Sequence, residues 1–171
     1  MSNDKDIIRI IPKLEIKEDY VVKGYQYEGV QKIDLPEVIA KKYYTDNADE
    51  LIFIDTVASL YGRNSLYDVI KKTAEKVFIP MTVGGGISSS EDIRKFLNSG
   101  ADKIAINTYA TKDKNFLKIA SETFGSQCIV LSIQAKKLNG GYYALTDNAR
   151  ENSGMLVKDW CEEAQSLGVG E

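Results

Sequence analysis

The chain has 171 residues, 43% of them hydrophobic and 27% charged, which suffices for one sizeable core and excludes a disordered chain. A formal net charge of -3 disfavours a nucleic-acid partner, which needs a basic face, but it is compatible with a small anionic ligand. Histidine is absent, and the two cysteines, Cys128 and Cys161, have no metal or redox spacing, so we expect a reduced protein without histidine catalysis, metal or cofactor.

The first residues, Met1–Asp6, are charged and lack the apolar stretch of a signal peptide or membrane span. We therefore expect a soluble, cytoplasmic protein without a membrane partner. Short apolar runs rich in β-branched residues then alternate with longer amphipathic stretches, the pattern of parallel strands and their crossover helices. The predicted strands are Arg9–Ile16, Glu50–Asp55, Ile79–Val83, Lys103–Asn107 and Cys128–Ala135. The predicted helices are Leu35–Asp46, Ser65–Lys76, Ser89–Asn98, Asp113–Phe124 and Val157–Leu167.

Two inserts are too long for simple strand-to-helix loops. Residues Glu15–Asp34 alternate in character and predict a partly strand-like flap. Residues Lys136–Gly154 contain Asn139-Gly140, the strongest short hairpin signal. Both inserts follow the carboxyl ends of odd-numbered strands, where the loops of a barrel build its active site.

An internal repeat extends the prediction to the fold class. Residues 48–56 resemble residues 101–108, and the opening of this template appears again at Gly168–Glu171, where a sixth strand would begin. The alternation alone fits either an open doubly wound sheet or a closed barrel. Similarity between even-numbered units favours the barrel. A complete (βα)8 barrel typically needs ~250 residues, so residues 1–171 are predicted to form one incomplete barrel domain of about five units, a fragment of a longer protein.

A glycine run is the clearest candidate for ligand binding. Gly84, Gly85 and Gly86 follow an apolar strand and precede Ser88–Glu91, which has the signature of a helix start. Such a loop brings backbone N–H groups and a helix dipole to a phosphate, although the same run could be only a tight turn. Asn107-Thr108 ends the next strand and adds an amide and a hydroxyl beside it.

Charged residues gather at both ends of the predicted strands. The amino ends carry two cations and two anions, which form either a structural ion-pair network or a gate to the core; they are Arg9, Glu50, Lys103 and Glu171. The carboxyl ends carry Glu15, Asp55 and Gln134, of which only the carboxylates can act as general acid or base.

Eight segments share their order and residues with one enzyme family; they are Arg9–Glu15, Val21–Gly24, Asp49–Leu51, Thr82–Ile87, Gly100–Lys103, Ile106–Thr108, Phe124–Gln127 and Asp159–Trp160. Together they resemble the cyclase subunit of imidazole glycerol phosphate synthase. The resemblance implies a TIM barrel of histidine biosynthesis. It also implies a glutaminase partner whose ammonia enters at the barrel bottom, and a phosphorylated ribosyl-type substrate at the top.

The resemblance also assigns roles to single residues. It implies an ammonia gate formed by Arg9, Glu50, Lys103 and Glu171. It implies a phosphate and substrate site at Gly84, Gly85, Gly86, Asn107, Thr108 and Asp55, with Lys23 as a catalytic lysine of the flap.

The chain departs from the family at the catalytic carboxylates. The family pairs two aspartates at the positions of Glu15 and Gln134, and a glutamine cannot exchange a proton. The segments Arg9–Glu15 and Val57–Asn64 instead resemble paralogues associated with surface-polysaccharide sugar amidation, which are thought to conduct ammonia to a separate amidotransferase. A cyclase, an ammonia-conducting subunit and an inactive fragment remain alternatives.

Overall fold

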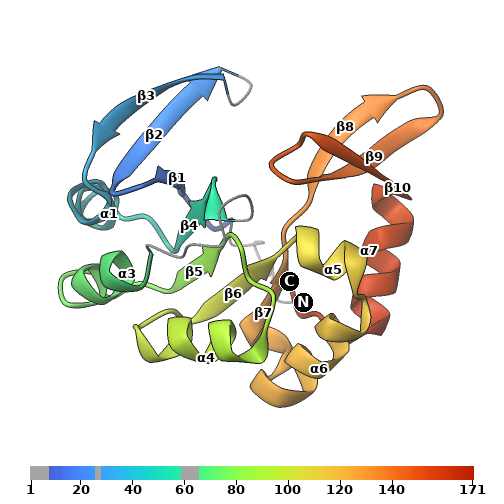
Figure 1. The fold of residues 1–171 in the computed structure, drawn as a ribbon. Coiled ribbons are helices and arrows are strands. Elements are labelled where there is room, and N and C mark those ends of the chain that lie inside the picture. The colour runs from blue at the N-terminus through green and yellow to red at the C-terminus, as the bar shows by residue number, and fades with distance from the viewer. Residues whose placement is uncertain (1–7, 26–27, 59–65) are drawn as a thin grey trace, which may run out of the picture.

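A computed structural model describes residues 8–25, 28–58 and 66–171. Its main feature is a seven-stranded sheet in the order β3-β2-β1-β4-β5-β6-β7 (Figure 1). These strands are β1 (Lys13–Lys17), β2 (Tyr20–Tyr25), β3 (Glu28–Asp34), β4 (Leu51–Asp55), β5 (Met81–Gly84), β6 (Lys103–Ile106) and β7 (Ile129–Leu131). A second, three-stranded sheet consists of β8 (Gln134–Leu138), β9 (Gly141–Thr146) and β10 (Glu151–Leu156).

Helices cover the outer face of the main sheet (Figure 1). They are α1 (Pro36–Thr45), α3 (Leu66–Ala74), α4 (Ser90–Asn98), α5 (Thr108–Lys112), α6 (Asn115–Phe124) and α7 (Val157–Ser166). Strands β1, β4, β5, β6 and β7 are parallel and follow one another in chain order. A doubly wound sheet would reverse its order at a switch point, so this α/β fold has the single winding of a barrel. Within the described residues the sheet stays open, with β3 and β7 as its ends.

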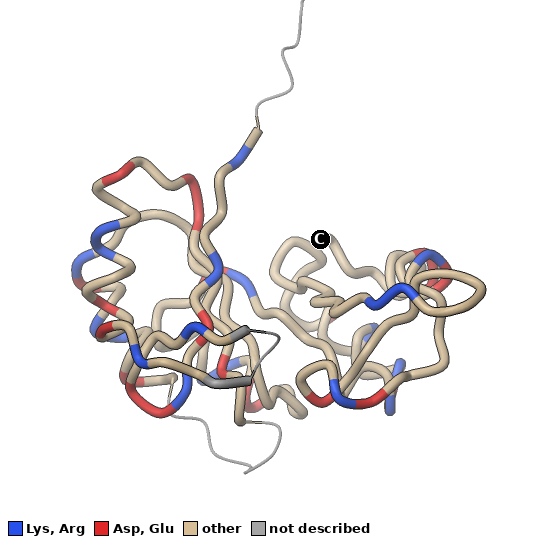
Figure 2. Tube along the Cα trace, turned by 90° about the horizontal axis from the view of Figure 1, so that it is seen from above, with Lys and Arg blue, Asp and Glu red and all other residues tan. Residues whose placement is uncertain are grey.

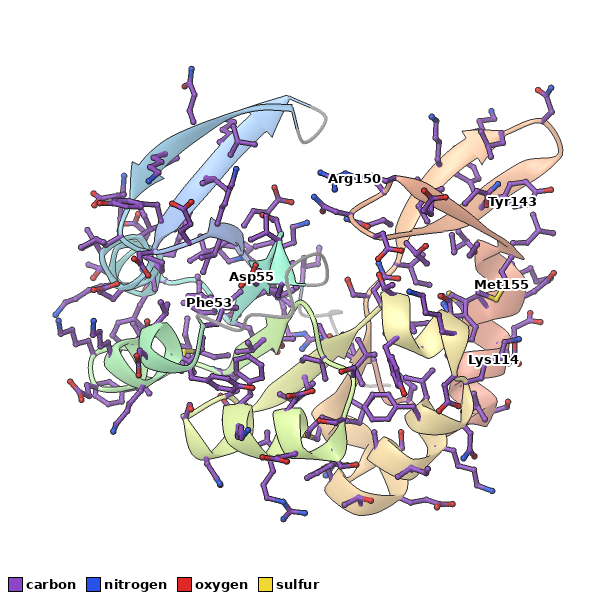
Figure 3. The ribbon with its side chains drawn as sticks, in the orientation of Figure 1. Phe53, Asp55, Lys114, Tyr143, Arg150 and Met155 are labelled. Atoms are coloured by element: carbon purple, nitrogen blue, oxygen red, sulfur yellow. The ribbon has the colours of Figure 1, made fainter. Side chains whose placement is uncertain are left out.

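The core lies between the sheet and the helices because each strand alternates its side chains. Leu14 and Ile16 of β1 are buried, whereas Lys13 and Glu15 face the opposite, concave side. In β4, Phe53 lies on the helix side and Asp55 at the end of the strand (Figure 3). Acidic and basic residues are interspersed along the chain, and neither sign dominates one region (Figure 2).

The internal repeat corresponds to the same helix-ending turn at three places in the chain. Each copy opens with a residue of positive φ that ends a helix, at Asn47 (64°), Gly100 (108°) and Gly168 (92°). The N–H of the next residue then donates to a carbonyl five residues earlier, at distances of 3.0, 3.1 and 3.2 Å. This is the Schellman arrangement, which satisfies the last carbonyls of a helix and turns the chain toward the sheet.

The third position of the repeat fastens each copy to the neighbouring strand. Asp49 and Asp102 each exchange two hydrogen bonds with a residue there: their N–H groups donate to Ile10 O (3.0 Å) and Met81 O (2.8 Å), and their Oδ2 atoms accept in return. In the third copy Gly170 N–H donates to Ile129 O at 3.3 Å, and Glu171 O accepts from Leu131 N–H at 2.7 Å. Residues 170 and 171 therefore hydrogen-bond to β7, the end strand of the sheet.

The structure confirms the two predicted inserts. Residues 15–34 contain the antiparallel hairpin of β2 and β3. Asn139-Gly140 connects β8 to β9, where Leu138 pairs with Gly141.

Several predicted boundaries are wrong. The strand predicted over Cys128–Ala135 ends at Leu131, because Ser132 N–H donates to Ile106 O and the chain then leaves the main sheet for β8. The strand predicted from Arg9 begins at Lys13, although Ile10 O and Pro12 O already accept hydrogen bonds from the β4 segment. Helix α5 and a 3-10 turn at Ser126–Cys128 were not predicted, since both are too short to show a periodic pattern. The predicted segment Val57–Asn64 falls partly outside the described residues.

Candidate functional site

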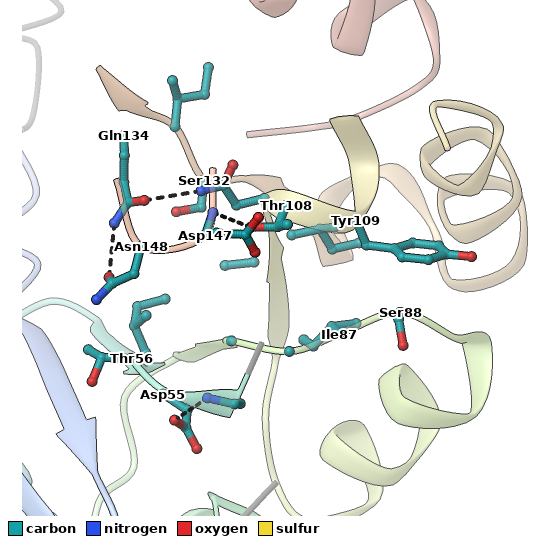
Figure 4. Close-up of a pocket in the computed structure, with 18 of the residues that line it drawn as sticks. Asp55, Thr56, Ile87, Ser88, Thr108, Tyr109, Ser132, Gln134, Asp147 and Asn148 are labelled. Atoms are coloured by element: carbon teal, nitrogen blue, oxygen red, sulfur yellow. Dashed lines mark hydrogen bonds between the residues drawn. The ribbon is translucent and has the colours of Figure 1, made fainter. Parts of the chain in front are cut away.

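A cavity of about 380 Å³ lies at the carboxyl ends of the parallel strands (Figure 4). Its walls come from β1, from the loops after β4, β5 and β6, from the start of β8 and from the turn between β9 and β10. Polar and glycine residues of this lining include Lys13, Asp55, Gly85, Gly86, Asn107, Thr108, Lys112, Gln134, Asp147 and Asn148. The cavity thus lies where the active site of a parallel βα fold is expected.

The backbone conformation of the loop after β5 requires glycine at two positions. Gly85 and Gly86 have φ values of 106° and 68°, which other residues adopt at a cost. A Cβ atom on Gly85 would lie 2.4 Å from Asp55 O, and one on Gly86 would lie 2.7 Å from the Ala58 Cβ. The loop therefore presents bare backbone to the cavity. Helix α4 follows, with Ser89 Oγ accepting from Asp92 N–H at its N-cap.

Asp55 holds the loop after β4 in place. Its Oδ1 accepts hydrogen bonds from the N–H groups of Val57 and Ala58, both at 2.9 Å, and the residue is 5% exposed. This oxygen is occupied by the backbone, so Asp55 shapes the wall beside Gly85 as well as lining the cavity.

A chain of amide hydrogen bonds connects three walls of the cavity (Figure 4). Asn107 Nδ2 donates to Gln134 Oε1 at 3.5 Å and to Leu145 O at 3.4 Å, and Gln134 Nε2 donates to Asn148 Oδ1 at 3.4 Å. Thr108 Oγ1 accepts from Asp147 N–H at 3.0 Å. The end of β6 is thereby joined to the second sheet through Gln134.

The turn after β9 has an unusual backbone. Asp147, Asn148 and Ala149 have consecutive φ values of 49°, 60° and 63°. Aspartate and asparagine tolerate the left-handed region, but alanine has no polar side chain to compensate for it. This strained turn brings Asp147 and Asn148 to the cavity.

Not all predicted site residues line this cavity. Gly84 ends β5, and its missing Cβ leaves room for Ala105 and Ile54, each with an atom 2.8 Å from that position. Lys23 lies exposed on β2 and Glu15 on β1, both outside the lining. Lys13 and Lys112 were missed, although Lys13 shares the period-two face of Glu15 and could have been found from it.

The amino ends of the strands hold a second constellation, the charge ring, which consists of Arg9, Glu50, Lys103 and Glu171. Glu50 accepts from Arg9 Nη1 and, at 3.0 Å, from Lys103 Nζ. Glu171 accepts from Arg9 Nη2 at 2.8 Å and from Lys103 Nζ at 2.7 Å. Each charge therefore touches two opposite charges, and the ring is closed and neutral.

The charge ring shifts the ionisation of its members. Hydrogen bonding to Lys103 and then to Arg9 lowers the pKa of Glu171 despite partial burial. Partial burial alone would lower the pKa of Lys103, but its hydrogen bonds to Glu171 and Glu50 outweigh this and raise it. Hydrogen bonds to Glu50 and Glu171 raise the pKa of Arg9. All three shifts favour the charged forms.

Comparisons with known proteins agree on one family. A profile described as "Histidine biosynthesis protein" matches residues 9–171. The chain is 50% identical over its whole length to the imidazole glycerol phosphate synthase subunit HisF of Legionella pneumophila, covering 79% of that protein. It is 45% and 42% identical, over 95% of its length, to the HisF subunits of Campylobacter concisus and Natranaerobius thermophilus. It spans 65% of the length of these two proteins.

In the described part of the chain no helix has the length and apolar character needed to cross a membrane.

Proposed function

Because the chain belongs to the histidine biosynthesis protein family, we propose that it is a cyclase-type subunit of a glutamine amidotransferase, working in the cytoplasm with a glutaminase partner. Ammonia would enter through the charge ring and react at the cavity with a phosphorylated ribosyl-type substrate. This is the role of an imidazole glycerol phosphate synthase subunit, the name that the relatives carry.

The observation that carries the proposal is the pairing of the charge ring with the cavity at opposite ends of the same strands. Glu50 precedes β4 and Asp55 ends it, while Lys103 opens β6 and Asn107 follows it. A mouth closed by side chains, rather than by backbone, can open by rotation of those side chains. Because the four charges satisfy one another, the closed state needs no counter-ion from solvent.

The surroundings of the charge ring support a protein partner at this end. Ile10 and Phe78, which precede β1 and β5, are 67% and 76% exposed, and Ile8 is 84% exposed. Large apolar side chains that gather on an exposed surface mark protein interaction sites. We assign this surface to the glutaminase.

The glycine loop supports a phosphorylated substrate. Gly85 and Gly86 present backbone without side chains, and Thr108 lines the same cavity with a hydroxyl. Lys112 adds a cation to this lining. A phosphate is stabilised by such a combination of N–H groups, a hydroxyl and a positive charge.

A second function, ammonia delivery to a separate sugar amidotransferase, is favoured by the altered carboxylate pair. Glu15 is bound to Lys13 at 2.8 Å and lies outside the cavity lining, and Gln134 is held between Asn107 and Asn148. Neither arrangement provides the proton donor and acceptor of a cyclase. The ring and the phosphate site would serve equally well in either role.

Reconstitution tests both functions. The chain is mixed with the glutaminase subunit of an imidazole glycerol phosphate synthase, and complex formation is followed by analytical ultracentrifugation and glutamate release. We expect a complex that Phe78→Ser weakens at least tenfold, with Ile119→Ser, another exposed apolar residue, as the control. No complex at tens of micromolar would overturn the proposal. Imidazole product from the nucleotide substrate would establish the cyclase role and exclude the amidation role.

A further inference from the structure

The tip of the β8–β9 hairpin carries an asparagine–glycine pair that the proposed function does not use. Leu138 pairs with Gly141, so Asn139 and Gly140 form the two-residue loop between the strands. Both loop residues are exposed, and the hairpin projects away from the main sheet (Figure 1). Asn139 therefore meets solvent at the opposite end of β8 from Gln134, the residue that lines the cavity.

The loop leaves the backbone nitrogen of Gly140 unshielded. A two-residue hairpin loop lies outside the ladder of hydrogen bonds, which ends at the pair of Leu138 and Gly141. Gly140 has no side chain, and beyond its chain neighbours the atom nearest to a Cβ at this position is Tyr143 Oη, at 3.7 Å. Its φ of 101° is one that glycine adopts without strain. The nitrogen can therefore approach Cγ, the side-chain carbonyl carbon of Asn139.

Other asparagines of the described chain are restrained by hydrogen bonds. For three of them the N–H group of the following residue donates to a backbone carbonyl, at 3.0, 3.0 and 3.2 Å; they are Asn47, Asn98 and Asn115, followed by Ala48, Ser99 and Phe116. The side chains of Asn107 and Asn148 are held by hydrogen bonds to Gln134. A group restrained in this way must give up a hydrogen bond before it reacts.

Asn152 is the asparagine best matched to Asn139. Both are exposed and border the same shallow hollow at the hairpin tip. Ser153 follows Asn152, and its hydroxyl donates to Ala144 O at 2.7 Å. Asn152 Oδ1 also accepts a hydrogen bond from Gly154 N–H at 2.9 Å. Solvent thus reaches both asparagines, but in the whole sequence glycine directly follows only Asn139.

We propose that Asn139 is a modification site that deamidates without an enzyme, with water as the co-reactant. The Gly140 nitrogen loses its proton to a solvent base and attacks Asn139 Cγ, which forms a new C–N bond. The bond between Cγ and Nδ2 breaks, and Nδ2 takes up a proton and leaves as ammonia, so that a succinimide ring remains. Water then opens the ring at either of its carbonyl carbons. The products are aspartate and isoaspartate, and no oxidant or reductant takes part.

The two products should affect the hairpin differently. Aspartate–glycine fits the same two-residue turn as asparagine–glycine. Isoaspartate instead leads the main chain through the former side chain and adds a methylene to the loop, which then no longer matches the pairing of Leu138 with Gly141. We therefore expect isoaspartate to speed hydrogen exchange of the β8 and β9 amides, and Asn139→Asp to leave it unchanged. Equal exchange in the two forms would contradict this consequence.

Peptide mapping by mass spectrometry tests the proposal on the full chain. The folded protein is incubated in warm, mildly alkaline buffer, and the mass gain from exchanging NH2 for OH is followed in the peptides that contain Asn139 and Asn152. We expect Asn139 to convert about tenfold faster, because a serine side chain hinders the nitrogen that glycine leaves bare. Asn139→Gln should remove most of the mass gain of the intact protein, whereas the matched control Asn152→Gln should retain it.

The same incubation in urea shows whether the folded loop permits the reaction. We expect Asn139 to convert in the folded protein at a rate within about threefold of that in the unfolded chain. Conversion in urea but not in the folded protein would overturn the proposal, because the hairpin would then protect Asn139. Equal rates at Asn139 and Asn152 in the folded protein would also overturn it.

Discussion

The amino ends and the carboxyl ends of the parallel strands carry polar groups of different kinds. At the amino ends, four full charges neutralise one another in the charge ring, and its residues belong to the strands or directly flank the sheet. At the carboxyl ends, the cavity is lined mainly by glycines, amides and hydroxyls from loops and from the second sheet. The charges at the amino ends pair with one another, whereas the carboxyl ends offer hydrogen-bond donors and cations to a ligand.

The difference shows that the polar groups at the amino ends and at the carboxyl ends of the strands are determined by different features of the sequence. The charge ring follows from the repeat, because Glu50, Lys103 and Glu171 each stand one residue after the position that fastens a unit to its neighbour. The cavity follows from backbone conformations in the loops, such as those at Gly85 and Ala149. Charge changes should therefore act mostly at one end, and backbone changes at the other.

The largest effect is expected for Gly85→Ala. The new methyl group would lie 2.4 Å from Asp55 O at a φ of 106°, and we expect a loss of about 3 kcal/mol in the free energy of unfolding, measured by urea denaturation. Gly154→Ala is the matched control, since Gly154 also has a positive φ, 77°, but nothing lies within 4 Å of its Cβ position. Equal losses in the two variants would show that the contact with Asp55 contributes nothing.

Glu50→Gln should come next. It leaves Arg9 and Lys103 without one of their two carboxylates at a buried position, and we expect a loss of about 2 kcal/mol in urea denaturation. The comparison is Glu163→Gln, which breaks the exposed pair with Lys114 and should cost less than about 0.5 kcal/mol. The prediction fails if the two variants lose the same stability.

Ala149→Gly should have a smaller effect of opposite sign. Glycine adopts a φ of 63° without the penalty of a Cβ atom, so we expect a gain of about 1 kcal/mol in stability. Ala135→Gly, in the neighbouring strand β8, should instead lose about 0.5 to 1 kcal/mol. Destabilisation by Ala149→Gly would contradict this, because it would mean that the methyl group of Ala149 contributes more to stability than its positive φ costs.

The smallest effect concerns pH. The lowered pKa of Glu171 stabilises the fold above the ordinary glutamate value of 4.5, and this contribution is lost as pH falls through the lower folded value. The raised pKa values of Lys103 and Arg9 act in the opposite direction, because their contribution is present below the ordinary pKa of each group and is lost as pH rises through the higher folded value. Glu171→Gln should therefore flatten the acid side of a plot of unfolding free energy against pH, measured by urea denaturation. An unchanged acid side would contradict the ionic role of Glu171.

The sequence predicts the strand-and-helix order well because apolar periodicity and the repeat are local signals. The β2–β3 flap and the Asn139-Gly140 hairpin follow from alternation and turn chemistry for the same reason. The end of β7 at Leu131 could not be predicted, because the apolar run continues past the point where Ser132 makes its last hydrogen bond to β6. Tertiary contacts, not local preference, end that strand.

For the charge ring and the cavity, too, part of the arrangement could be predicted from the sequence and part could not. Which side chains gather at each strand end follows from strand polarity, so the members of the charge ring and the glycine loop were accessible to sequence reasoning. The partner of each side chain was not. That Lys13 rather than Glu15 reaches the cavity, and that Gln134 bonds to Asn148 across the strained turn, depends on rotamers and loop paths that no local pattern encodes.

In the three copies of the Schellman turn, the backbone position and the charge of the side chain are set by different residues. In each unit the turn and the backbone bond to the next strand fix where the chain lies, and the residue that follows is then free to be glutamate, lysine and glutamate in turn. The pattern of positive and negative charges at the amino ends of the strands is consequently set by single residues, on a frame that backbone hydrogen bonds build. A protein engineer could therefore invert or weaken that pattern one unit at a time without redesigning the sheet.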